Sequence, residues 1–372
     1  MAEDKPWFVI AGGGTGGHLY PGLAVAQALL ALQPEFDVTI FGTPRPIDEQ
    51  LTGPRGYELV KQEVCAFPRK PWHIFRFLSA WHRSVKYAKE RFKTRRPAVV
   101  LGLGGYAAGP PVIAAAKLKV PTALFNPDAM PGLANRYLAS KVDRIFIQWR
   151  ETADHFNRRP NIKCTGCPIR LDFIRVDREE AIRALKLNPR KKTLLITGAS
   201  QGAWSINAAV MELVDFWKEN DAWQILHLTG TADLAMCREK YKKAGVPART
   251  LAFTEHMPYC MAAADLVISR AGASTLAEII ALGLPSVLMP YPFDRKKHQL
   301  ANAKLLADCN AAELLEDAND VEKNAKNLRE LLTGLMNSEA RRRHLSEVAG
   351  AMGRHDAAQA IAEELWEMGR TG

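Results

Sequence analysis

His18 is the first residue whose type and position could do chemistry. It follows the glycine-rich stretch GGGTGG, residues 12–17, and begins an apolar helical pattern, so we expect it in the first turn of a helix. The positive end of a helix dipole favours the neutral form of an imidazole. A neutral imidazole can take the proton of an attacking hydroxyl as a general base. The alternative is that His18 hydrogen-bonds to the glycine loop and shapes it.

The glycines before His18 fit two phosphate-binding patterns. Gly12, Gly14 and Gly17 satisfy G-x-G-x-x-G, in which glycines let the backbone approach a pyrophosphate. The spacing also fits a P-loop, but His18 and Leu19 stand where that loop needs Lys and Ser or Thr. A dinucleotide site further needs an acidic residue at the end of the second strand, where this chain has glycine and threonine. The loop therefore indicates phosphate binding or close backbone approach without selecting a ligand.

Three further small-residue turns follow strand-like runs. The run VVLGLGG leads to Tyr106, LLITGAS leads to Gln201, and LVISRAG leads to Thr275 and Glu278. Each turn precedes a helix N-terminus, where backbone N–H groups favour anions. In doubly wound sheets, ligands bind outside the carboxyl ends of the strands. Together with the first loop, these turns predict a polar cleft between two halves of the chain and a nucleotide-like ligand held from both sides.

The elements that must position these turns alternate along the chain. Short β-branched and aromatic runs such as WFVIAG and TLLITGAS alternate with helical patterns, which is typical of parallel βαβ units. A chain of 372 residues is long enough for two domains. We predict an α/β fold of two doubly wound, Rossmann-like domains, the first over 1–168 and the second over 169–349. A C-terminal helix, about 350–372, is expected to pack back on the first domain and close the fold.

The net charge, the cysteines and the N-terminal sequence limit which partners and which cellular location we expect. The formal net charge of +10 favours anionic ligands or surfaces. The N-terminus lacks the pattern of a secretory signal, and no apolar run approaches the roughly 18 residues that span a bilayer, so we expect a cytoplasmic protein. Cys164 and Cys167 form a single C-x-x-C without a second pair, which favours buried thiols over a zinc or redox site.

Six motifs, taken together, resemble one known family. The chain contains, in the family's order and approximate spacing, GGTGGHLYPGLAVA, LGLGGYAAGPP, TGCPIR, GASQGAWSIN, SRAGASTLAEIIALGLPSVLMPYP and HQLANA. This set is similar to that of the MurG-type transferases of peptidoglycan synthesis, over nearly the whole chain. The resemblance implies a GT-B fold with UDP-N-acetylglucosamine in the cleft and a polyprenyl-diphosphate-linked muramoyl-peptide acceptor on the N-terminal domain. It also implies transfer of N-acetylglucosamine to the muramoyl C4 hydroxyl with inversion.

The resemblance gives roles to residues at matching positions. Glu278 matches a carboxylate that accepts hydrogen bonds from both ribose hydroxyls, and Arg170 matches an arginine near the donor. Asp128 lies by the donor sugar and is a second candidate for the general base, beside His18. Tyr106 could face the acceptor or pack under its own loop. The residues implied to bind the donor are Thr15, Gly16, Gly17, Asp128, Arg170, Ser200, Gln201, Thr254, Ala273, Ser274, Thr275, Leu276, Ala277, Glu278 and Gln299.

The chain also departs from the family pattern. Where the family commonly has Glu-Gln-Asn, this chain has Asn126, Pro127 and Asp128, and Cys167 replaces the asparagine of a G-N-P motif. These changes leave the donor class in place and bear on the choice of sugar. The sequence has no D-x-D and no cluster of metal ligands, so no metal or other cofactor is expected. Helix N-termini, loop amides and Arg170 can stabilise the leaving diphosphate instead.

A basic stretch in the first half suits a membrane surface. From Arg69 to Arg96 the chain has ten Lys or Arg residues and one acid, Glu90, with aromatic and aliphatic residues among them. Such a helix can lie on an anionic membrane. The alternatives are a core helix with a basic wet face, or a nucleic-acid patch, for which no recognised motif is present. We favour peripheral contact with the cytoplasmic face of the inner membrane, and no nucleic-acid partner, through Trp72, Phe75, Arg76, Leu78, Arg83 and Lys86.

Other functions fit parts of the sequence. A UDP-sugar epimerase of the same fold would need neither an acceptor nor a membrane contact, and a related transferase could use another lipid acceptor. A nicotinamide dehydrogenase rests on the first glycine pattern alone and lacks the acidic residue. A non-catalytic nucleotide-sugar sensor would keep the loops and lose turnover. We favour the transferase because the resemblance covers nearly the whole chain.

Overall fold

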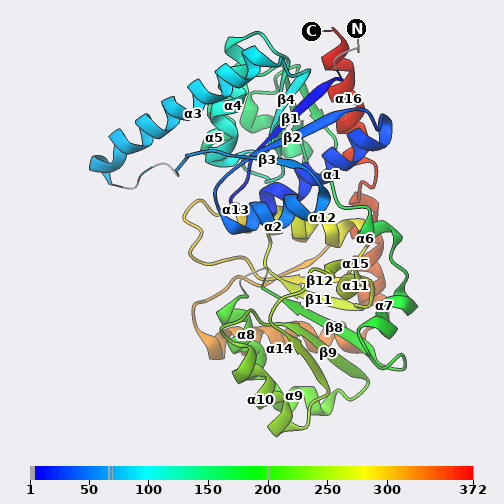
Figure 1. The fold of residues 1–372 in the computed structure, drawn as a ribbon. Helices are drawn as coiled ribbons and strands as arrows, with labels where there is room; N and C mark the ends of the chain where they lie inside the picture. Colours follow the sequence, from blue (N-terminus) through cyan, green and yellow to red (C-terminus); the bar gives the residue numbers. More distant parts are fainter. Residues whose placement is uncertain (1–4, 66–67, 69, 199–201, 372) are drawn as a thin grey trace. The chain divides into compact units, whose positions relative to one another are not determined.

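The computed structural model describes residues 5–65, 68, 70–198 and 202–371. The chain divides into two compact domains, the first from Met1–Arg170 with Arg354–Gly372 and the second from Leu171–Gly353. Each domain has one parallel sheet with helices packed around it (Figure 1). The predicted α/β architecture of two Rossmann-like domains is therefore confirmed.

The first domain is built on a seven-stranded sheet, as far as the structure describes it, in the order β3-β2-β1-β4-β5-β6-β7. Its central strands are continuous apolar runs because helices cover both faces of a parallel sheet. All five residues of the first strand, WFVIA, are buried. The strands are β1 (Trp7–Ala11), β2 (Asp37–Gly42), β3 (Glu58–Lys61), β4 (Val99–Gly102), β5 (Thr122–Asn126), β6 (Arg144–Ile147) and β7 (Ile162–Cys164). The helices are α1 (Gly16–Leu32), α2 (Pro46–Thr52), α3 (Ile74–Thr94), α4 (Gly105–Lys117), α5 (Leu133–Leu138) and α16 (Ala357–Thr371), with 3₁₀ turns at Gly53–Arg55, Pro71–His73, Ala139–Lys141 and Arg150–Phe156.

The last helix, α16, belongs to the first domain. It packs along α1, and Trp366 places its ring 4.7 Å from that of Phe36. The nearly buried carboxylate of Glu364 pairs with Arg144, at 2.7 Å, and with Lys163. These ring contacts and ion pairs thus hold α16 against the sheet of the first domain.

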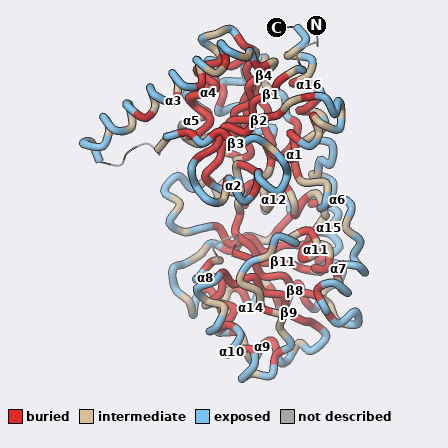
Figure 2. Tube along the Cα trace, viewed as in Figure 1, coloured by how far each residue is buried: buried red, intermediate tan, exposed pale blue. Residues whose placement is uncertain are grey.

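The second domain is built on a six-stranded sheet among its described residues, in the order β10-β9-β8-β11-β12-β13. Figure 2 shows the strands of this sheet as mostly buried and the surrounding helices as exposed on their outer faces. The strands are β8 (Lys192–Thr197), β9 (Trp223–Leu228), β10 (Ala248–Leu251), β11 (Leu266–Ser269), β12 (Ser286–Leu288) and β13 (Glu313–Leu314). The helices are α6 (Asp172–Arg175), α7 (Arg178–Ala184), α8 (Trp204–Met211), α9 (Val214–Glu219), α10 (Leu234–Ala244), α11 (Met257–Ala262), α12 (Ala273–Ala281), α13 (His298–Asp308), α14 (Val321–Asn337) and α15 (Glu339–Met352).

Both sheets reverse their strand order at one point, and the glycine turns lie there. In the first sheet the order reverses between the neighbours β1 and β4, and in the second between β8 and β11. The carboxyl ends of such strands open a crevice in which ligands bind. The loops that leave these four strands are the four small-residue turns of the sequence. Each domain therefore has such a crevice at its switch point.

Helix α3 is only partly covered by its domain. Its buried residues are Ala80, Ser84, Ala88 and Phe92, which recur every fourth position in its later turns. Its N-terminal end projects away from the sheet in Figure 1. A helix buries an apolar stripe against its domain, and here that stripe begins only after the first turn and a half. The aromatic residues before it remain outside the core.

Candidate active site

A buried carboxylate holds the first glycine loop. Asp48, from α2, accepts hydrogen bonds from the backbone N–H of Gly14, at 2.7 and 3.0 Å, and from both the N–H and the hydroxyl of Thr43. A Cβ on Gly13 would lie 2.2 Å from an Asp48 oxygen, so a side chain there would collide with the carboxylate. Close backbone approach therefore explains Gly13 and Gly14. The predicted contacts of Thr15, Gly16 and Gly17, at the start of α1, with the donor remain predictions.

His18 lies in the first turn of α1, as predicted. Its Nδ1 is 3.1 Å from the Thr15 hydroxyl, and its half-buried ring lies beside Gly105 at the start of α4. Burial lowers the pKa of His18 below its usual value, and the negative charges of Asp128 and Asp48 only partly oppose this. The imidazole is therefore neutral at pH 7. If Nδ1–H donates to Thr15, Nε2 is the basic nitrogen.

Asp128 follows β5 on a turn that other side chains fix. Asn126 donates to the Asp128 carbonyl at 2.6 Å, and Asn135 of α5 donates to the Asn126 side-chain oxygen at 3.0 Å. Asn135 also packs against Gly104, where a Cβ would be 3.2 Å from its amide. Because the charge of Asp128 acts on the pKa of His18, the structure brings the two base candidates together. Asn135 and Asp48 were missed from the sequence, since their partners are distant in the chain.

Tyr106 and Arg170 lie in the same domain. The Tyr106 hydroxyl is 3.1 Å from the position of a Cβ on Gly14, so the phenol packs against the glycine loop. Arg170, at the end of the first domain, stacks its guanidinium over the ring of Tyr20 at 4.5 Å. This stacking holds the cation near α1, the helix that carries His18.

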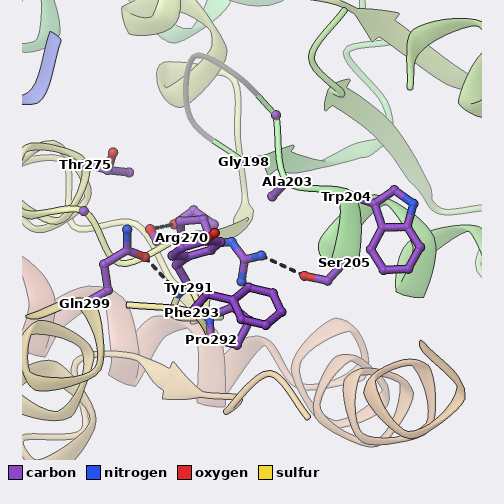
Figure 3. Close-up of a pocket in the computed structure, with 13 residues that line it drawn as sticks. Gly198, Ala203, Trp204, Ser205, Arg270, Thr275, Tyr291, Pro292, Phe293 and Gln299 are labelled. Carbon is purple, nitrogen blue, oxygen red and sulfur yellow. Dashed lines mark hydrogen bonds between the residues drawn. The ribbon is translucent and has the colours of Figure 1, made fainter. Parts of the chain in front are cut away.

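The second domain has a pocket of about 290 Å³ at the carboxyl ends of β8, β11 and β12 (Figure 3). Thr275 and Gln299, both predicted from the sequence, line it. Three aromatic residues that the sequence analysis did not single out, Trp204, Tyr291 and Phe293, also contribute. The pocket combines apolar rings with hydroxyl and amide groups, which is the usual composition of a small-molecule site.

The turn after β8 approaches its neighbours closely. Gly202 has φ +77°, and a Cβ there would lie 2.2 Å from the carbonyl oxygen of Thr229. Ala203 and Trp204 then start α8, whose N-terminus opens beside the pocket. A helix N-terminus at this place suits an anionic group. Ser200 and Gln201, predicted to meet the diphosphate, lie outside the described residues.

The α12 segment divides into lining and core residues. Thr275 lines the pocket, whereas the side chains of Leu276 and Ala277 are buried in the domain. Ala273 is also buried, and Ser274 and Glu278 are half-buried. Leu276 and Ala277 can therefore contribute to a ligand site only through their backbone, because their side chains pack inward.

Thr254 is not among the residues that line the pocket. It is on the loop between β10 and α11, and its hydroxyl accepts a hydrogen bond from the N–H of His256 at 3.0 Å. Glu278 likewise does not line the pocket, although it follows Thr275 by about one turn of α12. The predicted roles of both residues in nucleoside binding remain predictions.

A buried ion pair ties the walls of this pocket together. Arg270 donates to the carbonyls of Met289 and Pro290, at 2.9 and 3.0 Å, and to Asp317 at 3.1 Å. Its second nitrogen donates to Ser205, in the first turn of α8, at 2.7 Å (Figure 3). Burial lowers the pKa of Arg270, which Asp317 only partly offsets, and hydrogen bonds hold the pKa of Asp317 below its usual value despite burial. Arg270 belongs to the motif that begins SRAGAST, but the spacing of that motif does not indicate a buried ion pair with Asp317.

The described residues contain no group of three or more His, Cys, Asp or Glu side chains placed to hold a metal ion. No helix among them is long and apolar enough to cross a membrane.

The fold and the positions of both sites define a class of protein. Residues 8–147 match the glycosyltransferase family 28 N-terminal domain, and residues 193–361 match its C-terminal domain. The structure is similar to that of Acinetobacter baumannii MurG, with a TM-score of 0.73 and 25% identity, covering 97% of this chain and 99% of that one. A UDP-GlcNAc 2-epimerase from Neisseria meningitidis shares the fold alone, with a TM-score of 0.70 and 13% identity over 97% of this chain and all of that one. These two domains are those of a GT-B glycosyltransferase.

Sequence relatives narrow the class to one family. A UDP-N-acetylglucosamine--N-acetylmuramyl-(pentapeptide) pyrophosphoryl-undecaprenol N-acetylglucosamine transferase from Halalkalibacterium halodurans is 37% identical over 95% of this chain and 97% of its own length. The chain therefore belongs to the MurG-type transferases of glycosyltransferase family 28, as its motifs predicted.

Proposed function

We propose that this protein transfers N-acetylglucosamine from UDP-N-acetylglucosamine to the C4 hydroxyl of a polyprenyl-diphospho-muramoyl peptide, with inversion at the anomeric carbon. The observation that carries the proposal is the neutral His18 held beside Asp128 at the glycine loop of the first domain. The names of the relatives supply the donor and the acceptor. Inversion by a single displacement needs one base for the acceptor hydroxyl and stabilisation of the leaving UDP.

The first domain supplies the base. His18 Nε2 takes the proton of the C4 hydroxyl as that oxygen attacks the anomeric carbon and the bond to UDP breaks. The charge of Asp128 stabilises the imidazolium that forms, because a nearby carboxylate favours the protonated ring. Thr15 keeps the ring oriented through Nδ1. Tyr106 packs against the same loop at Gly14.

The second domain holds the donor. The N-terminus of α8 and the turn after β8 provide backbone N–H groups for the diphosphate. Glu278 accepts hydrogen bonds from the ribose hydroxyls, Thr254 lies at the uracil, and Gln299 binds hydroxyls of the sugar. Arg170 adds a positive charge near the leaving group. These dipoles and charges can stabilise the departing diphosphate in place.

The protein contacts the cytoplasmic face of the membrane through the first turns of α3 and the residues just before it. Trp72 and Phe75 are 66% and 78% exposed, and Leu78 is exposed as well. Arg76, Arg83 and Lys86 lie on the same helix; the guanidinium of Arg83 lies 3.6 Å from the Glu63 carboxylate, and the ammonium of Lys86 lies 3.9 Å from that of Glu90. Exposed aromatic side chains beside cations suit the headgroup region of an anionic membrane. Trp81, in contrast, packs against the core of the domain.

Label transfer tests the proposed reaction. UDP-N-acetylglucosamine labelled in the sugar is incubated with the protein, with and without a short-chain muramoyl-pentapeptide lipid. We expect label in the lipid only when the acceptor is present, and NMR should show the new bond at C4 with inverted configuration. Conversion of the donor sugar to its epimer without acceptor would contradict the transferase and favour the epimerase.

A further inference from the structure

The turn between β12 and α13, residues 291–297, carries a cluster of cations to which the proposed reaction gives no role. Arg295, Lys296 and Lys297 are consecutive and exposed. None of the three pairs with a carboxylate in the part of the chain that the structure describes. Three adjacent cations without such a partner make a local positive field, which attracts anionic groups.

The backbone of the 291–297 turn is held in one conformation. The side chain of Asp294 accepts hydrogen bonds from the N–H groups of Lys296 and Gln299, both at 3.2 Å. The Asp294 carbonyl accepts from the N–H of Lys297 at 2.8 Å, and Lys297 has φ +52°. Because both carboxylate oxygens of Asp294 bind backbone groups, the one acid of the turn serves its conformation, and the cations are presented on a fixed backbone.

The same turn forms one wall of the donor pocket. Tyr291 and Phe293 line the pocket, with their rings edge to face and their centroids 5.7 Å apart (Figure 3). The N–H of Tyr291 donates to the side chain of Gln299 at 3.0 Å. Gln299 is the residue proposed to bind the donor sugar. The three cations therefore lie in the short segment of chain that joins Phe293 to Gln299, two residues that line the pocket.

The covalent structure of the acceptor indicates which of its anionic groups can lie near the 291–297 turn. In a muramoyl peptide the reacting hydroxyl is on C4, and the peptide hangs from the lactyl ether on C3, the neighbouring carbon. The acceptor diphosphate is on C1, across the ring. When C4 attacks the donor sugar, the peptide thus begins beside that sugar, while the diphosphate is directed away from it.

We infer that the 291–297 turn binds the carboxylates of the acceptor's peptide through Arg295, Lys296 and Lys297, so that the second domain selects the peptide as well as the donor. The inference rests on the proposed function. It makes these three residues specificity-determining for the acceptor, and it separates recognition of the peptide from recognition of the lipid diphosphate.

The test uses the full-length protein and two short-chain acceptors. One is the muramoyl-pentapeptide lipid, and the other carries a neutral methylamide on the lactyl group in place of the peptide. The variant R295Q/K296Q/K297N removes the three charges, with Asn chosen for the left-handed position because Asn tolerates it. The control K186Q/R190Q/K242Q removes three exposed cations elsewhere in the second domain, none of them in an ion pair among the described residues.

We expect the first variant to raise KM for the peptide acceptor about tenfold at low ionic strength, as the sum of three exposed charge contacts allows. KM for the methylamide acceptor and for UDP-N-acetylglucosamine should not change, and the control variant should behave as the unaltered protein. An unchanged KM for the peptide acceptor, an equal loss with both acceptors, or an equal loss in the control would overturn the inference while the transferase stands. No transfer to either acceptor by the unaltered protein would overturn the proposed function itself.

Discussion

The two domains hold their glycine turns by different means. In the first domain a buried carboxylate, Asp48, binds the loop from below, and titratable groups, His18 and Asp128, stand beside it. In the second domain the turn after β8 packs on a neighbouring backbone carbonyl, and an ion pair, Arg270 with Asp317, ties the pocket walls. The switch point of the first domain thus carries the two candidates for the general base, and that of the second domain carries a pocket beside a buried ion pair.

Because the two domains differ in this way, we expect proton transfer to depend on the first domain and donor binding to depend on the second. The donor pocket, as far as it is described, contains no His, Asp or Glu among its lining residues, so it has no base to offer a hydroxyl. The first domain has the proposed base, His18, but an N–H of its glycine loop is already bound by Asp48. Substitutions in the two domains should therefore affect kcat and donor affinity separately.

Removing the base should have the largest effect. His18→Ala should lower kcat by about 10²- to 10⁴-fold, since it removes the general base, and leave UDP affinity nearly unchanged. Steady-state transfer to a short-chain acceptor, with calorimetry of UDP binding, measures both. Should Asp128→Asn lower kcat far more than His18→Ala, the base is Asp128.

Breaking the ion pair of the second domain comes next. Arg270→Met leaves the buried Asp317 without its cation, which should lower the free energy of unfolding by about 3 to 5 kcal/mol and raise KM for the donor. Arg329→Met is the control, because its pair with Glu219, at 3.4 Å, is exposed and should contribute at most about 1 kcal/mol. Chemical denaturation measures the free energy of unfolding of both variants. Equal losses of this free energy would mean that the Arg270 pair does not hold the pocket.

The cations of α3 should matter only at a membrane. The variant R76Q/R83Q/K86Q should lose up to about 3 kcal/mol of affinity for anionic liposomes, at about 1 kcal/mol per charge, and high salt should mimic it. Turnover of a short, water-soluble acceptor should survive. If the variant and the parent sediment equally with the liposomes, the exposed face of α3 is only a solvated basic surface.

Removing the carboxylate of Glu278 should have a smaller effect, and on UDP affinity where His18→Ala acts on kcat. Glu278→Ala should weaken UDP binding by about 1 to 3 kcal/mol, through the loss of charge-assisted hydrogen bonds to the ribose, with kcat at saturating donor nearly intact. Calorimetry with UDP measures the change. An unaltered affinity would remove Glu278 from the donor site.

A buried histidine gives the second domain its own pH dependence. Burial lowers the pKa of His227 from 6.5 to about 3, and its ring nitrogens lie 3.1 Å from the Tyr241 hydroxyl and 3.0 Å from the Asn207 side chain. Between these pKa values the unfolded chain binds one more proton than the folded one. The free energy of unfolding should therefore fall by about 1.4 kcal/mol per pH unit as pH is lowered from 6 to 4, and His227→Gln should remove this slope. Urea unfolding at several pH values measures it, and an equal slope in both proteins would contradict the assignment.

The central strands of both sheets could be predicted from the sequence, and the edge strands of the first sheet could not. Apolar runs such as WFVIAG identified the central strands because strands covered on both faces are apolar throughout. The edge strands β3 and β7 are only four and three residues long and largely exposed, so their sequences carry no such pattern.

The site could be predicted where one segment contains it. The glycine turns, His18 and Thr275 follow from local order along the chain. Asp48 and Asp317 could not be found in this way, because Asp48 binds Gly14 from 34 residues away and Asp317 binds Arg270 from 47 residues away. Such partners are set by tertiary packing, which local spacing does not encode.

The pH dependence of kcat tests the assignment of His18 most directly. Transfer to a short-chain acceptor is measured at saturating donor and acceptor, for the unaltered protein and for His18→Ala. Because burial holds the pKa of His18 below the usual histidine value of 6.5, kcat of the unaltered protein should be level near pH 7 and fall as pH drops through that lowered pKa. The variant should be slow and lack this acid limb. An acid limb with its midpoint above 6.5, or one that persists in His18→Ala, would contradict the account.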